Sequence, residues 1–224
     1  AVTVLVPPGA SPHLFEPRPS AVARLAGARL LVEVGEDLDG WIARLRGALS
    51  APVPTLTLLA LPGLEPLPAD AAHAGETAGP GTRHGRHDPH VWLDPIRVRD
   101  VIAPALAERL AALDPGGRGY YEQRLAAFRE ELSALDGALR ARLAGPRRGY
   151  VAFHSAWRYF GARYGLEEIG VVHESAGEEP TPRELAALVA AARQAAVPAI
   201  LIEPQLDARV ARTLAREFGA RVVM

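Results

Sequence analysis

Short apolar runs rich in Val and Leu alternate with longer runs of helical periodicity along most of this chain, and this alternation restricts the fold more than any other feature. The apolar runs are bounded by Pro and Gly, which is typical of strands. The runs between them repeat apolar residues every three or four positions, which is typical of amphipathic helices. Strands that alternate with helices form mainly parallel sheets, so we expect an α/β fold. Strands are predicted over residues 1–7, 29–35, 52–58, 148–153, 166–172, 199–203 and 220–224, and helices over 19–28, 36–49, 155–165, 181–196 and 207–219.

One long amphipathic stretch interrupts the alternation. Its apolar positions step by three and four residues, which predicts a single helix from Arg118 to Leu143. At about 1.5 Å per residue such a helix would be about 39 Å long, which suits a connection between two lobes. We therefore predict an N-terminal lobe over residues 1–115, a bridging helix over 116–145 and a C-terminal lobe over 146–224.

Residues 60–89 form the second interruption. They are rich in Pro, Gly, Ala and His and show no periodicity, so they predict a long loop. A loop of this length in a compact domain is commonly functional or disordered. It carries His73, His84 and His87, which are either weak auxiliary metal ligands or solvated side chains.

Composition limits the chemistry available to this chain. It has 224 residues and no Cys, which leaves His and carboxylates as metal ligands and excludes disulfides. A net charge of −1 gives no reason to expect nucleic acid as a partner. No apolar run approaches the roughly 18–20 residues that a membrane-spanning helix needs. We recognise no signal peptide, because the chain opens on a predicted strand.

Three histidines lie on stiff backbone near the ends of predicted strands. His154 follows a strand directly, and His13 and His90 lie in turns that Pro residues restrict. Ligands of open α/β sheets bind beyond the carboxyl ends of the strands, so the three imidazoles are candidate ligands of one ion between the lobes. Taken singly, each is better explained as a hydrogen-bonded turn or core residue, and their wide spacing matches no short zinc motif.

Five segments resemble one known family. "PPGASPHLFEPRPS", "HDPHVWLDP", "FHSAWRYFGARYGL", "GEEPTPRELAAL" and "ILIEPQLDARVARTLAREFGARV" are similar, in order, to the metal-binding solute receptors of ABC importers, the ZnuA/TroA group. The resemblance implies two α/β lobes bridged by a long helix, with a metal ion in the cleft between them. Its ligand positions correspond to His13, His90 and His154. Zinc receptors carry His at the third position where many manganese receptors carry Glu, and imidazole suits Zn²⁺ better than Mn²⁺.

The resemblance implies that the chain is not an enzyme but a monomeric, exported receptor that delivers Zn²⁺ to the permease of an ABC importer. We expect it in the periplasm or as a cell-surface lipoprotein, with a zinc metallochaperone as a further candidate partner. The alternatives are a receptor for manganese or another divalent metal, an adhesin-like surface lipoprotein of the same fold, and a zinc-dependent hydrolase. A catalytic zinc also has three protein ligands, but no His-Glu-x-x-His motif is present.

The surroundings of the ligands are predicted from proximity in sequence. Glu16 and Asp88 are candidates to orient an imidazole N–H, as carboxylates near metal sites commonly do. Glu203 ends a predicted strand and ranks below the histidines as a ligand, and His173 is expected to be structural. Family members continue into a segment with an Asp as fourth ligand, so we expect that ligand beyond Met224 and the chain to be part of a longer protein.

Overall fold

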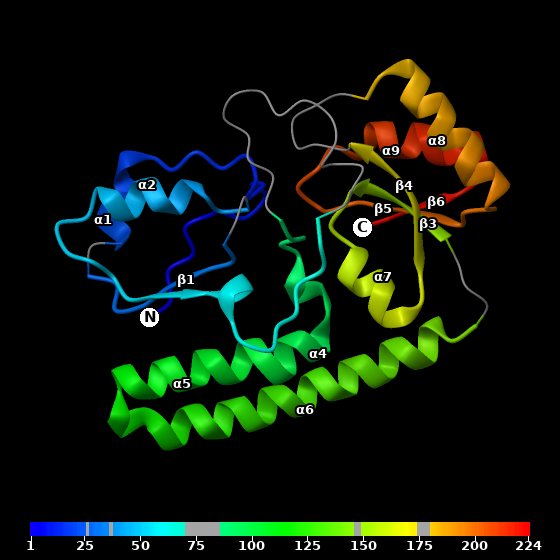
Figure 1. Cartoon of the computed structure of the whole chain (residues 1–224). Coiled ribbons are helices and arrows are strands. Elements are labelled where there is room, and N and C mark those ends of the chain that lie inside the picture. Colours follow the sequence, from blue (N-terminus) through cyan, green and yellow to red (C-terminus); the bar gives the residue numbers. More distant parts are fainter. Residues whose placement is uncertain (26, 36–37, 70–85, 146–148, 174–179) are drawn as a thin grey trace.

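The computed structural model describes residues 1–224 with the exception of 26, 36–37, 70–85, 146–148 and 174–179. Two sheets and one long helix organise these residues (Figure 1). The smaller sheet has the strand order β1-β2, and the larger has the order β4-β3-β5-β6. The strand pairings in both sheets are parallel, which confirms the predicted α/β class.

The N-terminal lobe surrounds the smaller sheet. It contains α1 (Pro19–Leu25), β1 (Leu31–Glu33), α2 (Trp41–Gly47) and β2 (Thr55–Thr57). The helices bury apolar residues spaced three or four positions apart, as their periodicity predicted. One core cluster of this lobe consists of Ala21, Leu25, Leu31, Trp41, Ile42 and Leu45. A second core cluster consists of Leu56, Leu58, Leu64, Val91, Ile102 and, from α7 (Arg158–Tyr164), Tyr159.

The C-terminal lobe surrounds the larger sheet. Its elements are β3 (Gly149–His154), α7 (Arg158–Tyr164), β4 (Glu167–His173), α8 (Pro182–Gln194), β5 (Ala199–Leu201), α9 (Ala208–Phe218) and β6 (Arg221–Val223). Helix α8 begins where Thr181 and Glu184 form a capping box, which satisfies amide groups that the helix itself leaves unpaired. Helix α9 begins at the capping side chain of Asp207 and ends at the left-handed Gly219. Strands β3 and β5 lie between β4 and β6, and Val151, Ala152 and Ile200 are completely buried.

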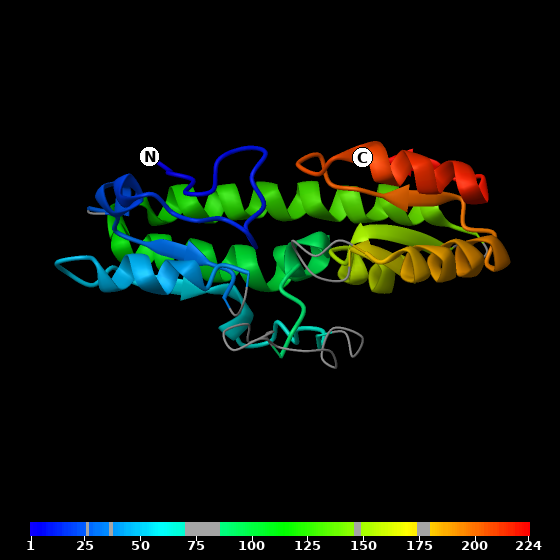
Figure 2. The same cartoon turned by 90° about the horizontal axis from the view of Figure 1, so that it is seen from above.

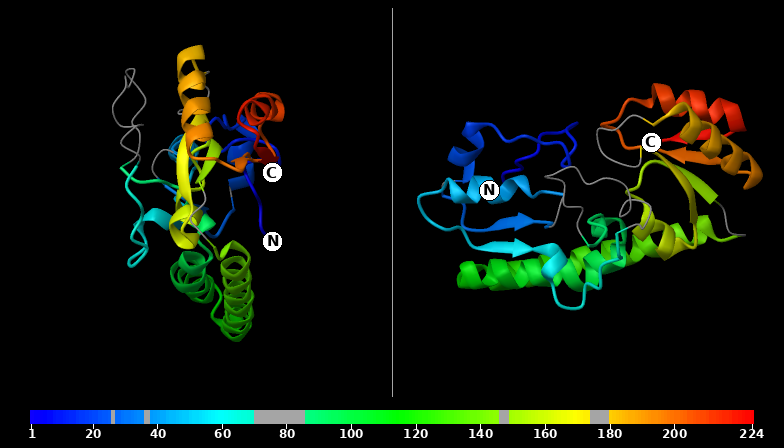
Figure 3. Two further views of the ribbon diagram at one scale, coloured as in Figure 1. Left: turned by 90° about the vertical axis from the view of Figure 1, so that its right-hand side faces the viewer. Right: turned by 45° about the horizontal axis from the view of Figure 1, so that its top comes forward.

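Helix α6 (Arg118–Leu143) runs beneath both lobes, which stand on the same side of it (Figures 1 and 3). Seen from above, it extends along most of the length of the molecule and passes under both lobes (Figure 2). Near its C-terminal end Asp136 accepts hydrogen bonds from Arg163 and Tyr164 of α7, which ties the helix to the C-terminal lobe. The continuous helix matches the predicted bridge, while the lobe boundaries at residues 115 and 146 stay a prediction.

One expectation from the sequence was wrong, and one helical region was not predicted. Residues 1–7 form no strand; Val2 and Val4 are 95% and 69% exposed, and no described strand pairs with them. An apolar segment forms a strand only where a neighbouring strand accepts its backbone hydrogen bonds and other residues cover one of its faces.

The helical region after Asp94 was not predicted from the sequence. It contains α4 (Pro95–Arg97), a π-helical turn at Val98–Ile102 and α5 (Ala103–Leu113).

The missed helical region has a local explanation. Asp94 caps its start by accepting from the amides of Ile96 and Arg97. Pro104, which has no N–H, lies just after the π-helical turn, where the regular α-helical ladder is already interrupted. A Pro inside a helical pattern normally ends the helix, so Pro104 argued against a helix in this region. No helix among the described residues is long and apolar enough to cross a membrane.

Candidate metal centre

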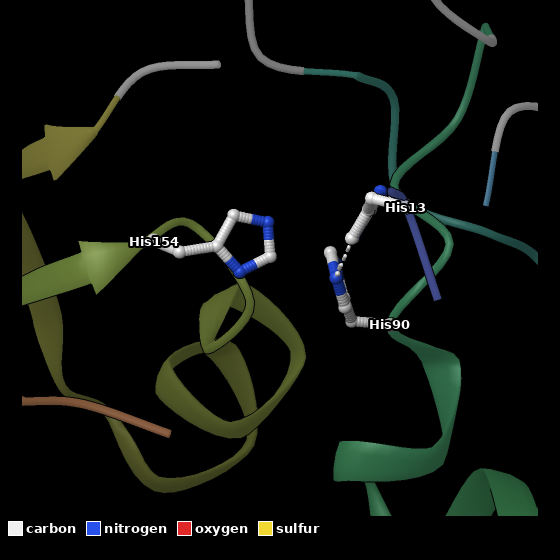
Figure 4. A group of neighbouring side chains, drawn as sticks. All are labelled: His13, His90 and His154. Atoms are coloured by element: carbon white, nitrogen blue, oxygen red, sulfur yellow. Dashed lines mark hydrogen bonds between the residues drawn. The ribbon is translucent and has the colours of Figure 1, made fainter. Parts of the chain in front are cut away.

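Three histidines from distant parts of the chain meet between the two lobes. His154 is the last residue of β3, His90 immediately precedes a 3₁₀ turn at Val91–Leu93, and His13 lies in the loop before α1. Figure 4 shows His154 approaching from β3 and the other two from the opposite side. One nitrogen of each ring lies within 4.8 Å of those of the other two.

Each histidine is held by a specific neighbour. Asp88 Oδ1 accepts from the backbone N–H of His90 at 2.9 Å and lies 2.8 Å from its Nδ1. Glu203 Oε1 lies 2.8 Å from Nδ1 of His154. The indole of Trp41 donates to the carbonyl of Pro12 at 3.1 Å, which fixes the loop that carries His13.

These contacts decide which ring nitrogens are free. A carboxylate that accepts from Nδ1–H leaves Nε2 as the unprotonated nitrogen, and this applies to both His90 and His154. Nε2 of His13 lies 3.2 Å from Nε2 of His90. Two nitrogens bound to tetrahedral Zn²⁺ at about 2.0–2.1 Å are separated by about 3.3 Å, so this pair already has the spacing that zinc requires.

The protonation state of His13 also suits a metal. Burial, together with the nearby His154 and His90, lowers its pKa from 6.5 to about 3. The neutral imidazole keeps a lone pair available for coordination at neutral pH. Zn²⁺ is bound by neutral imidazole, so this donor set fits the ion.

The cluster forms part of the wall of a cavity of about 960 Å³. Residues of both lobes line it, including Trp92 from the N-terminal side and Phe153 and Trp157 from the C-terminal side. The three histidines therefore face an interlobe cleft rather than open solvent. His90 is only 5% exposed, which limits competition from water.

The other predicted residues are placed differently. Asp88 contacts His90, whereas Glu16 is exposed and is not among the residues that line the cavity. His87 lies in an isolated bridge to Pro68, and His73 and His84 lie outside the described residues. His173 lines the cavity, with its ring centroid 4.7 Å from that of Phe153.

The contact between Glu203 and His154 was missed, since Glu203 was considered only as a weak candidate ligand. The predicted strands already contained the information needed to expect this contact. Both residues lie at the carboxyl ends of strands predicted to be parallel, and these ends of neighbouring parallel strands meet at one edge of a sheet. The structure pairs Val151 and Ala152 of β3 with Ile200 and Leu201 of β5, which brings the two residues together.

The family model described as "Zinc-uptake complex component A periplasmic" matches residues 1–224. The chain belongs to this ZnuA family. It is 30% identical to the zinc-binding lipoprotein AdcA of Streptococcus pneumoniae over 226 residues, covering 98% of this chain and 44% of that protein. It is 33% identical over 216 residues to the high-affinity zinc uptake system protein ZnuA of Paracoccus denitrificans, covering 80% of this chain and 61% of the relative.

A solved structure supports the same assignment. A crystal structure of ZnuA superposes with a TM-score of 0.83 at 32% identity and covers 99% of this chain and 80% of that one. This similarity confirms the family and the α/β architecture with a long helix. The chain spans 44% of the length of the pneumococcal relative.

Proposed function

We propose that this chain is a zinc receptor that acts outside the cytoplasm and delivers Zn²⁺ to the permease of an ABC importer. The observation that carries the proposal is the convergence of His13, His90 and His154 at the interlobe cavity. Two of the three rings are oriented through Nδ1 by carboxylates. A cluster held in this way is preorganised for a metal ion, because the rings need not be reoriented when it binds.

Zinc is the favoured cargo over manganese. All three proposed ligands are imidazoles, whereas Mn²⁺ prefers carboxylate, carbonyl and water oxygens. The two nearby carboxylates each place one oxygen against a histidine ring, and neither belongs to the group of converging ligand atoms. Nickel and copper also bind imidazole, so the metal acquired in the cell depends on its availability as well as on the site.

Membership of the family supports the proposed location and partners. Its model describes a periplasmic uptake component, and the pneumococcal relative is named a lipoprotein. We therefore propose an exported monomer, free in the periplasm or anchored at the cell surface, whose partner is a membrane permease. A zinc metallochaperone that loads the receptor is a further proposed partner. Membership of an uptake family favours a receptor over a zinc-dependent hydrolase.

Zinc titration of the metal-free protein tests the proposal. Wild-type protein should bind one Zn²⁺ tightly and Mn²⁺ much more weakly. His90→Ala should weaken zinc binding by orders of magnitude, because it removes a ligand and leaves Asp88 without the ring that it orients. His87→Ala is the matched control, since it also removes one imidazole but from outside the cluster. Equal zinc affinities for wild type and His90→Ala would disprove the ligand assignment.

A further inference from the structure

Helix α7 belongs to the C-terminal lobe by sequence, yet one of its side chains lies in the core of the N-terminal lobe. Tyr159 is 1% exposed and packs in a cluster with Leu56, Leu64 and Val91. Its ring therefore spans the boundary between the lobes next to the segment that carries His90. A Phe would fill the same apolar space, so the role of the hydroxyl needs a separate explanation.

The hydroxyl of Tyr159 joins two backbone groups of the N-terminal lobe. It donates to the carbonyl of Asp88 at 2.8 Å and accepts from the amide of Leu67 at 2.9 Å. Leu67 and Asp88 are themselves joined, because the amide of Asp88 donates to the carbonyl of Leu67 at 2.9 Å. A phenolic hydroxyl has one donor, and here both its donor and its acceptor capacity are used.

Arg158 reinforces the same contact. Its guanidinium donates to the carbonyl of Pro68 at 2.8 Å and lies 3.6 Å from Asp88 Oδ2. That oxygen is buried and has no hydrogen-bond partner among the described residues, so the guanidinium is its compensating charge. Two consecutive residues of α7 thus hold the backbone and the side chain of Asp88.

Asp88 in turn restrains the position of His90, one of the proposed metal ligands. Its Oδ1 holds both the backbone amide and Nδ1 of His90. The segment that contains Arg158 and Tyr159 also begins with His154, a second member of the cluster. One short segment therefore carries a ligand of its own lobe and restrains the ligand of the other lobe.

We propose that Tyr159 is a positioning residue for the metal centre, which sets the separation of His90 and His154 across the lobe boundary by holding Asp88. The proposal rests on the proposed zinc site. The interlobe contact keeps the site preassembled, so the binding energy of the ion is not consumed in bringing the two lobes into register.

Tyr159→Phe and Tyr164→Phe form a matched pair that tests the proposal. Each removes one hydroxyl from α7, but the hydroxyl of Tyr164 bonds to Asp136 at 3.2 Å, at the junction with α6. Tyr159→Phe should lower zinc affinity about 10- to 100-fold, the range typical for loss of a group that orients a ligand. It should also change the visible absorption spectrum of the Co²⁺-loaded protein, which reports ligand geometry. Tyr164→Phe should leave both unchanged, and a Tyr159→Phe affinity equal to that of Tyr164→Phe would overturn the proposal.

A second readout separates this proposal from the zinc site itself. In the metal-free protein, Tyr159→Phe should shift the side-chain ¹⁵N resonances of His90, while Tyr164→Phe should not. If the wild type binds no zinc, the proposed function fails, and unchanged His90 resonances would independently refute the positioning role. Arg158→Met is the alternative test variant if the Tyr159→Phe protein does not fold. It removes the Pro68 contact and should lower zinc affinity several-fold, and an unchanged affinity would count against the proposal.

Discussion

Removing the carboxylate of Glu203 should weaken zinc binding although Glu203 is not among the converging ligand atoms. Its Oε1 lies 2.8 Å from Nδ1 of His154. Its Oε2 is buried without a hydrogen-bond partner among the described residues, so the imidazole is the contact through which this carboxylate acts. In Glu203→Ala the Nδ1–H loses its acceptor, and the ring is free to rotate or to change tautomer.

The expected loss has a definite size. Replacing a carboxylate that orients a metal-bound imidazole commonly lowers metal affinity 10- to 100-fold, which is about 1.4–2.7 kcal/mol. Glu203→Ala should fall at the upper end, because the contact is short and largely buried. Glu203→Gln should fall at the lower end, since its amide oxygen can still accept from Nδ1–H but the charge is lost. His154→Ala should exceed both, because it removes the ligand itself.

Competition with a chelator at fixed pH measures these affinities. Asp207→Asn is the control, because it removes a negative charge from the same side of the cavity while Asn still caps α9. An affinity of Glu203→Ala equal to that of the wild type would refute the reasoning. A loss as large as that of His154→Ala would instead show that Glu203 binds the metal directly.

Three further results are expected. Because α6 joins the lobes as one continuous helix, X-ray scattering of metal-free and zinc-loaded protein should give nearly the same radius of gyration, and a change of several ångströms would contradict this. The pKa of His13 is lowered from 6.5 to about 3, so the unfolded chain binds a proton in that range that the folded chain does not. The metal-free protein should therefore lose stability as pH falls from 6.5 toward 3, and thermal melts of His13→Asn should lack part of this loss. Hydrogen bonds from Arg163 hold the pKa of Asp136 below its usual range, so Asp136→Asn should destabilise the fold at pH 7 by about 2 kcal/mol. That difference should shrink as the pH falls below about 4, where the carboxylate of the wild type begins to lose its advantage.

Short-range patterns in the sequence predicted most of the secondary structure. Periodicity located the long helix from Arg118 to Leu143, and apolar runs located strands in both sheets. The apolar pattern at residues 1–7 predicted a strand wrongly, because a strand also needs a neighbouring strand to pair with. Helix α5 was not predicted, because Pro104 lies inside it. Such patterns report local preference, while a strand also needs a partner and a helix can accommodate a Pro at an irregular turn.

The proposed ligands were predicted from their positions near strand ends together with the resemblance of their surrounding motifs, and the rest of the site depended on tertiary structure. Sequence alone does not say which ring nitrogen is free, because that is decided by the carboxylates beside His90 and His154. It also does not reveal that Tyr159 reaches into the other lobe to hold Asp88. The contact of Glu203 with His154 joins residues 49 positions apart through the pairing of β3 with β5. The contact of Tyr159 with Asp88 joins residues 71 positions apart and depends on the packing of the two lobes. Local chemistry therefore determined which residues were available to bind a metal, and the fold decided how they are oriented toward it.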